Sequence, residues 1–90
     1  MGVLIRRTGT IEEVEPCKND SYTYEQLQVI VGFYPRLFSS HDDDRVMVID
    51  DQAEEKGKLY NPKATSVIRK MGHSILVSGD ALVCTELELF

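Results

Sequence analysis

The clearest capacity for chemistry lies in the run Asn61-Pro62-Lys63-Ala64-Thr65. Asn is a preferred cap for a helix N-terminus, and Pro fits the first turn because it has no N–H to leave unsatisfied. Such a helix start presents backbone N–H groups, and Lys63 and Thr65 add a cation and a hydroxyl beside them. The run therefore predicts a helix that begins at Asn61 and a binding position for an anion. A cap role alone predicts that Asn61→Ala costs about 1 kcal/mol and that Asn61→Asp keeps the fold.

Four other side chains near the ends of predicted elements are candidates for ligand binding: Tyr60, Tyr34, Arg36 and Arg45. A tyrosine ring can stack on a base or sugar, and an arginine can hold a phosphate through two N–H groups. Alternatively, the tyrosines pack helix ends onto the sheet and the arginines pair with surface carboxylates. The predicted ligand-binding residues are Asn61, Lys63, Thr65, Tyr60, Tyr34, Arg36 and Arg45.

The sequence predicts no catalytic residue, no metal site and no cofactor. His41-Asp42-Asp43-Asp44 carries metal-ligand side chains, but adjacent residues of one short loop rarely converge on one ion. His73 has no cysteine or histidine at zinc spacing, and Cys17 and Cys84 are expected to be free thiols. The many carboxylates include no pair placed in apolar sequence, which a raised pKa would need. We therefore expect a protein that is not an enzyme.

Length and composition indicate one small domain over residues 1–90. The chain is 42% hydrophobic and 28% charged, which suits a single core. Asp and Glu outnumber Lys and Arg by 15 to 10, and the net charge of −5 disfavours a nucleic-acid backbone as the partner. No apolar run is long enough for a membrane span, and the N-terminal one is too short for a secretory signal. We expect a cytoplasmic protein with no membrane partner.

Hydrophobic periodicity and turn residues predict an α+β domain with the order β-β-α-β-β-α-β. The first helix begins at Thr23, which is expected to form a capping box with Gln26, and the second begins at Asn61. Both helices are expected mainly on one face of a mostly antiparallel sheet. The expected strands cover residues 3–6, 10–15, 33–38, 45–50 and 81–89.

Three of these strands carry further expectations. The uninterrupted apolar run at 46–49 indicates a strand covered on both faces. Pro35 has no N–H for a ladder, so its strand is expected at an edge. The last strand still alternates at Phe90, and its apolar side chains exceed what a small monomer can cover. The sequence therefore predicts a homo-oligomer.

Three segments together resemble a family of short phage and bacterial proteins, domain of unknown function 3846. The segments are Glu15-Pro16 with Tyr22-Thr23-Tyr24-Glu25-Gln26-Leu27-Gln28 and Val31-Gly32, then Asn61-Pro62-Lys63-Ala64-Thr65, then Gly79-Asp80-Ala81-Leu82-Val83. The chain departs from the family at Phe33-Tyr34-Pro35-Arg36, where a Gly-Tyr-Ile-like strand start is expected, and at 57–60, which is shortened. The resemblance implies a phage or mobile-element setting and no established activity.

Two functions of different classes remain open. The first is a non-enzymatic homo-oligomer that sequesters a phosphorylated, nucleotide-derived small molecule and so antagonises host antiviral defence, by analogy with other small phage proteins. It is motivated by the helix start at Asn61 with cations and tyrosines nearby. The alternative is an acidic protein-binding inhibitor of a host enzyme, or another regulatory or structural phage protein. It is motivated by the excess of acidic residues.

Overall fold

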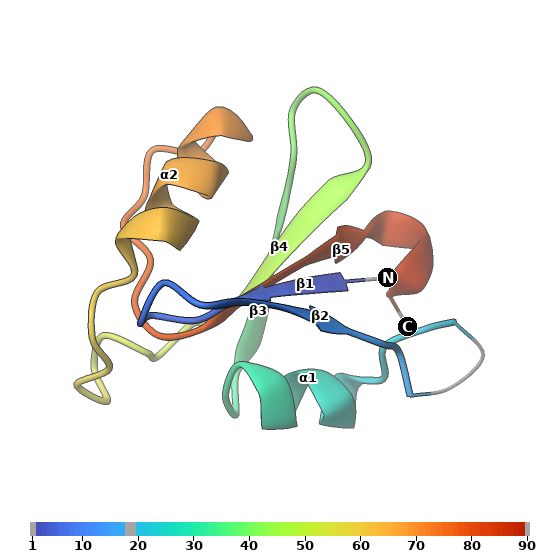
Figure 1. The fold of residues 1–90 in the computed structure, drawn as a ribbon, viewed down its shortest axis with the longest axis horizontal. Helices are drawn as coiled ribbons and strands as arrows, with labels where there is room; N and C mark the ends of the chain where they lie inside the picture. The colour runs from blue at the N-terminus through green and yellow to red at the C-terminus, as the bar shows by residue number, and fades with distance from the viewer. Residues whose placement is uncertain (1, 18–19, 90) are drawn as a thin grey trace.

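A computed structural model of the chain describes residues 2–17 and 20–89. All strand pairs are antiparallel, and they form one five-stranded sheet with the order β2-β1-β5-β4-β3. The strands are β1 (Gly2–Ile5), β2 (Ile11–Val14), β3 (Pro35–Ser39), β4 (Arg45–Asp50) and β5 (Ala81–Thr85). The helices are α1 (Tyr24–Ile30), α2 (Pro62–Lys70) and a short 3-10 helix, η1 (Glu86–Glu88). The predicted α+β class and element order are confirmed (Figure 1).

The two helices cover opposite faces of the sheet, so the expectation that both lie on one face is wrong. Met47 of β4 belongs to the same core as Ile68 of α2, whereas its neighbour Val48 belongs to the core that contains Leu27 of α1. Successive side chains of a strand point to opposite faces, so the two cores lie on either side of the sheet (Figure 1). β4 is buried from its second residue to its last, which confirms that it is covered on both faces.

α1 is tied to the segment that follows β2. The Thr23 hydroxyl accepts the N–H of Gln26 at 3.1 Å, which confirms the predicted cap. Gln26 does not complete the capping box, because its side chain accepts the N–H of Cys17 and donates to the carbonyl of Glu15, both at 2.9 Å. These two bonds fix the N-terminal end of α1 beside the end of β2.

The sheet has β3 at one edge and β2 at the other. The strand that begins at Pro35 is β3, and its place at the end of the strand order confirms the predicted edge position. At the other edge, each residue of β2 is exposed or half-buried. No helix within residues 2–17 and 20–89 is long and apolar enough to cross a bilayer.

The last strand ends at Thr85, so the strand predicted over 81–89 is wrong beyond that residue. The Glu88 carboxylate accepts two hydrogen bonds from Thr85, one from the backbone N–H at 2.9 Å and one from the side-chain hydroxyl at 3.1 Å. These bonds stabilise the single turn of η1. The turn leaves Leu87 88% exposed, while Leu89 forms a bridge with Tyr22. Phe90 lies outside the described residues. The homo-oligomer inferred from this strand stays a prediction.

Candidate functional site

Asn61 caps α2 as predicted, but its side chain is completely buried. The amide oxygen accepts the N–H of Ala64 at 3.0 Å, and Nδ2 donates to the carbonyls of Ile5 at 3.0 Å and Gly79 at 2.8 Å. Both donors and the acceptor are therefore used inside the protein. Asn61 joins α2 to the end of β1 and to the turn before β5, which is a structural role.

The rest of the predicted anion site is also largely directed inward. Thr65 is 2% exposed, and its hydroxyl accepts the N–H of Val77 at 2.8 Å. The N–H of Thr65 donates to the carbonyl of Asn61 within the helix. Lys63 is exposed, and its Nζ lies 3.3 Å from the carbonyl of Gly9 in the turn between β1 and β2. Of these residues, Lys63 keeps a side chain that a ligand can reach.

Tyr34 and Arg36 lie together at the start of β3, and Lys56 joins them from the loop after β4. The Lys56 Nζ is 5.4 Å from the centroid of the Tyr34 ring. The Arg36 guanidinium lies 4.9 Å from the centroid of the Phe38 ring and 3.0 Å from Asp51 Oδ1. We call Tyr34, Arg36 and Lys56 the β3 patch.

Arg45 and Tyr60 are separate from the β3 patch. Arg45 begins β4, whereas the last residue of β4, Asp50, pairs with Pro35 beside the patch. The Arg45 guanidinium pairs with Asp43 at 2.9 Å. Tyr60 forms a bridge with Ser78 next to the start of α2. The predicted ligand-binding residues therefore occupy different parts of the surface and interior.

Asp50 is a buried carboxylate held by two lysines. Its Oδ2 accepts from Lys56 at 3.0 Å and from Lys58 at 3.1 Å, and Oδ1 accepts the N–H of Gln52 at 3.0 Å. Burial alone would raise the pKa of Asp50, but these hydrogen bonds outweigh burial and hold the pKa below its ordinary value. Lys58 also donates to the carbonyl of Val31 at 2.9 Å, which joins the end of α1 to β4. The lowered pKa fits an anchor and not a general acid.

The two histidines lie close together, whereas the two cysteines are not paired with each other. His41 and His73, separate in the sequence, have ring centroids 4.8 Å apart, and His73 Nε2 donates to the carbonyl of Ser39 at 2.6 Å. No group of three or more metal-ligating side chains occurs within residues 2–17 and 20–89. Cys17 and Cys84 are free thiols as predicted, and burial raises the pKa of Cys84 to about 11. Cys84 is therefore protonated at neutral pH and poorly nucleophilic.

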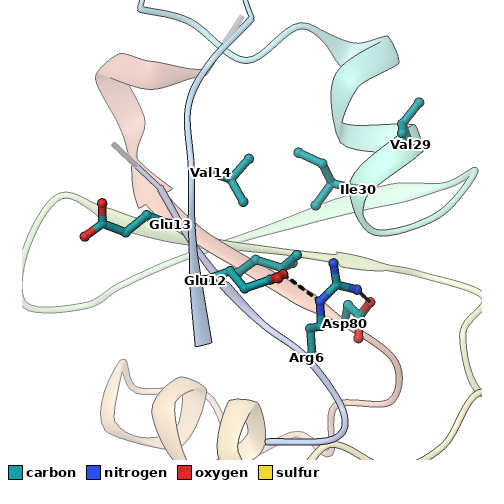
Figure 2. Close-up of a pocket in the computed structure, with 8 residues that line it drawn as sticks. Arg6, Glu12, Glu13, Val14, Val29, Ile30 and Asp80 are labelled. Atoms are coloured by element: carbon teal, nitrogen blue, oxygen red, sulfur yellow. Dashed lines mark hydrogen bonds and ion pairs between the residues drawn. The ribbon is translucent and has the colours of Figure 1, made fainter. Parts of the chain in front are cut away.

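A pocket of about 460 Å³ lies between α1 and the first two strands (Figure 2). Ile30 of α1 points toward Val14 of β2 across it, whereas its neighbour Val29 points away from Val14. Arg6 and Asp80 lie at its other end. We call this the acidic pocket; its lining residues are Leu4, Arg6, Glu12, Glu13, Val14, Val29, Ile30 and Asp80.

Arg6 organises the polar side of the acidic pocket. Its Nε donates to Glu12 at 2.6 Å, and NH1 donates to Asp80 at 3.3 Å, as Figure 2 shows. The hydrogen bond and charge of Glu12 raise the pKa of Arg6 above its ordinary value, so the guanidinium stays charged. Glu12 and Asp80 bring two carboxylates against this one guanidinium, whereas Glu13 also lines the pocket but points away from Arg6. The pocket therefore carries an excess of negative charge beside an apolar wall.

The residues of the acidic pocket differ from the predicted ligand-binding residues. Arg6 and Asp80 are 74 positions apart, and no local pattern indicates that they meet. One signal was present: Val29 falls outside the apolar stripe of the first helix and is 86% exposed in the structure. Val29 lies at the acidic pocket, but a single exposed apolar residue is common on protein surfaces and does not identify a site.

No family model, no curated protein and no solved structure matches this chain. The resemblance to domain of unknown function 3846 therefore stays a prediction.

Proposed function

We propose that this chain is a non-enzymatic binding protein whose partner is a basic segment of another protein, such as a host enzyme that it inhibits. The observation that supports this is the acidic pocket, in which the carboxylates of Glu12 and Asp80 outnumber the guanidinium of Arg6. A phosphate group would be repelled there, whereas a lysine or arginine head group would be attracted. The aliphatic stem of such a side chain would pack on the apolar wall.

We also propose a biological setting in which this protein acts. The resemblance to a family of phage and bacterial proteins implies a phage or mobile-element setting, and analogy with other small phage proteins suggests an antagonist of host defence in the host cytoplasm. The net charge of −5 is compatible with attraction to basic protein surfaces. A homo-oligomer is not required by this function, since the acidic pocket is formed within one chain.

The proposal predicts that Glu12→Lys weakens binding of a synthetic peptide of alternating lysine and valine about tenfold, because it reverses a charge at the pocket. Calorimetric titration at low salt measures the affinity, and at about 0.5 M salt the affinity should fall because exposed charges are screened. Asp42→Lys is the matched control, since Asp42 is exposed in the loop between β3 and β4 and the net charge changes equally. Equal losses in both variants, or no binding of the peptide, would contradict the proposal.

A second candidate function is supported by the β3 patch, where Tyr34 is 45% exposed. A base stacked on this ring would place a phosphate within reach of the nearby cations, so a phosphorylated, nucleotide-derived ligand fits this surface better than the acidic pocket. Asp51 already pairs with Arg36, but both side chains are more than half exposed and the pair is weak.

For this candidate, we expect Arg36→Glu to abolish the binding of any cyclic nucleotide that the protein recognises. Arg45→Glu should leave the affinity within about twofold, because Arg45 lies at the other end of β4 and outside the patch. Calorimetric titration with a panel of cyclic di- and trinucleotides and cyclic ADP-ribose isomers makes the comparison. If no nucleotide of the panel gives a heat of binding, the proposed nucleotide-binding function is wrong.

A further inference from the structure

We propose that the basic partner segment binds in an extended conformation as a sixth strand along β2, with alternate side chains entering the acidic pocket. This inference rests on the proposed function and specifies how the segment is held. β2 is an edge strand of the sheet, and its four residues are exposed or half-buried. An edge strand presents unpaired backbone groups to which an extended peptide can bond.

The register of the first hairpin identifies the backbone groups that face outward. The N–H of Arg6 donates to the carbonyl of Thr10 at 2.9 Å, so these residues are a hydrogen-bonded pair of the ladder. In the observed register, Leu4 lies opposite Glu12, and these two residues form the next hydrogen-bonded pair. Hydrogen-bonded and non-bonded pairs alternate, so the N–H and C=O groups of residues 11 and 13 point away from β1. They are positioned to bond an added strand.

The side chains of such a strand would reach the acidic pocket. Glu12 lies opposite Leu4, and Leu4 lies opposite Leu82, which belongs to the core on the α1 face. Glu12 therefore projects to the α1 face, and Glu13 to the other face, as Figure 2 shows. An added strand continues the same pleat, so every second side chain lies on the α1 face beside the pocket. Pocket and edge thus form one continuous surface.

Charge decides between the two possible occupants of this edge. A second copy of β2 would place Glu12 and Glu13 beside the same residues of the partner, and like charges on neighbouring strands are destabilising. A segment that alternates lysine or arginine with apolar residues would place its cations on the α1 face, beside Glu12. Its remaining side chains would match Ile11, which is 54% exposed. The occupant is therefore a basic, β-prone segment of another protein.

The first test changes one outward N–H. Glu13→Pro removes this N–H, and proline is tolerated on an edge strand where the N–H faces solvent. Glu13→Gln removes the charge but keeps the N–H. With the alternating lysine–valine peptide, we expect Glu13→Pro to weaken binding more than tenfold and Glu13→Gln only about threefold. Equal effects of the two substitutions, with both proteins folded by circular dichroism, would overturn strand addition.

The second test leaves the protein unchanged and so does not depend on folding of a variant. The same peptide with a methyl group on every backbone nitrogen cannot donate to an edge strand, although its charges and side chains remain. We expect its affinity for the unmodified protein to fall more than tenfold. If the N-methylated peptide binds as well as the parent, strand addition is wrong while the proposed function stands. If neither peptide binds, both proposals fail.

Discussion

Asn61→Asp is expected to lower the free energy of unfolding by about 3 kcal/mol, although aspartate caps helices as well as asparagine does. The substitution keeps the acceptor for the N–H of Ala64 but removes the two donors to the carbonyls of Ile5 and Gly79. It also buries a negative charge against those two oxygens, which is costly unless the group takes up a proton. Urea denaturation at neutral pH, followed by circular dichroism, measures the change.

The matched control is Thr23→Asp at the cap of α1. Thr23 is half-buried, and its hydroxyl accepts the N–H of Gln26, so aspartate preserves its capping bond. We expect a change within about 0.5 kcal/mol at this position. If Asn61→Asp were equally mild, the buried amide donors would contribute little and Asn61 would be only a cap. The sequence alone led to that milder expectation.

Asp50→Asn is expected to cost about 2 kcal/mol at neutral pH, because it weakens hydrogen bonds to two charged lysines and to the N–H of Gln52. The cost stays below that of breaking a fully buried ion pair, since Lys56 and Lys58 are about one-third exposed and can be hydrated. Asp51→Asn is the control. Asp51 is about half exposed and pairs with Arg36 at the surface, so its loss should change stability by less than about 0.5 kcal/mol.

The same carboxylate predicts how stability depends on acid. The pKa of Asp50 in the folded protein lies below the ordinary 3.8, so the folded state binds this proton less readily than the unfolded state. Its stabilising contribution is therefore complete above the unfolded pKa and is lost as the pH falls below about 4 through the folded pKa. Urea titrations at successive pH values should show a smaller acid-induced loss for Asp50→Asn than for the original protein. An identical loss would contradict this contribution.

Local signals predicted the helix ends well. The Asn61-Pro62 pair set the start of α2, which then runs from Pro62 to Lys70, because capping depends on adjacent residues. The faces that the helices cover were not predictable in this way. The buried run in β4 indicated cover on both faces, and one short helix can cover only one of them. Assigning both helices to one face conflicted with that run.

The candidate site was less predictable than the fold. Tyr34 immediately precedes β3 and Arg36 is its second residue, so their proximity followed from the sequence. The acidic pocket is formed by residues of β1, β2 and α1 together with Asp80. The distance between β2 and α1 is set partly by the hydrogen bonds of Gln26 to the segment after β2. Asn61 and Thr65 were recognised as polar residues at a helix start, but their hydrogen bonds reach Ile5, Gly79 and Val77, which only tertiary structure reveals.

The position of β5 has a consequence for how the chain folds. β5 lies between β1 and β4, and Val3 pairs with Val83 across nearly the whole length of the chain. The hairpins β1–β2 and β3–β4 are local and can form early, but they share no strand pair until β5 joins them. Pairing over such a separation carries a large loop-closure entropy and slows folding. A nascent chain that still lacks β5 would therefore hold two unconnected hairpins, and its sheet would be completed only after β5 has left the ribosome.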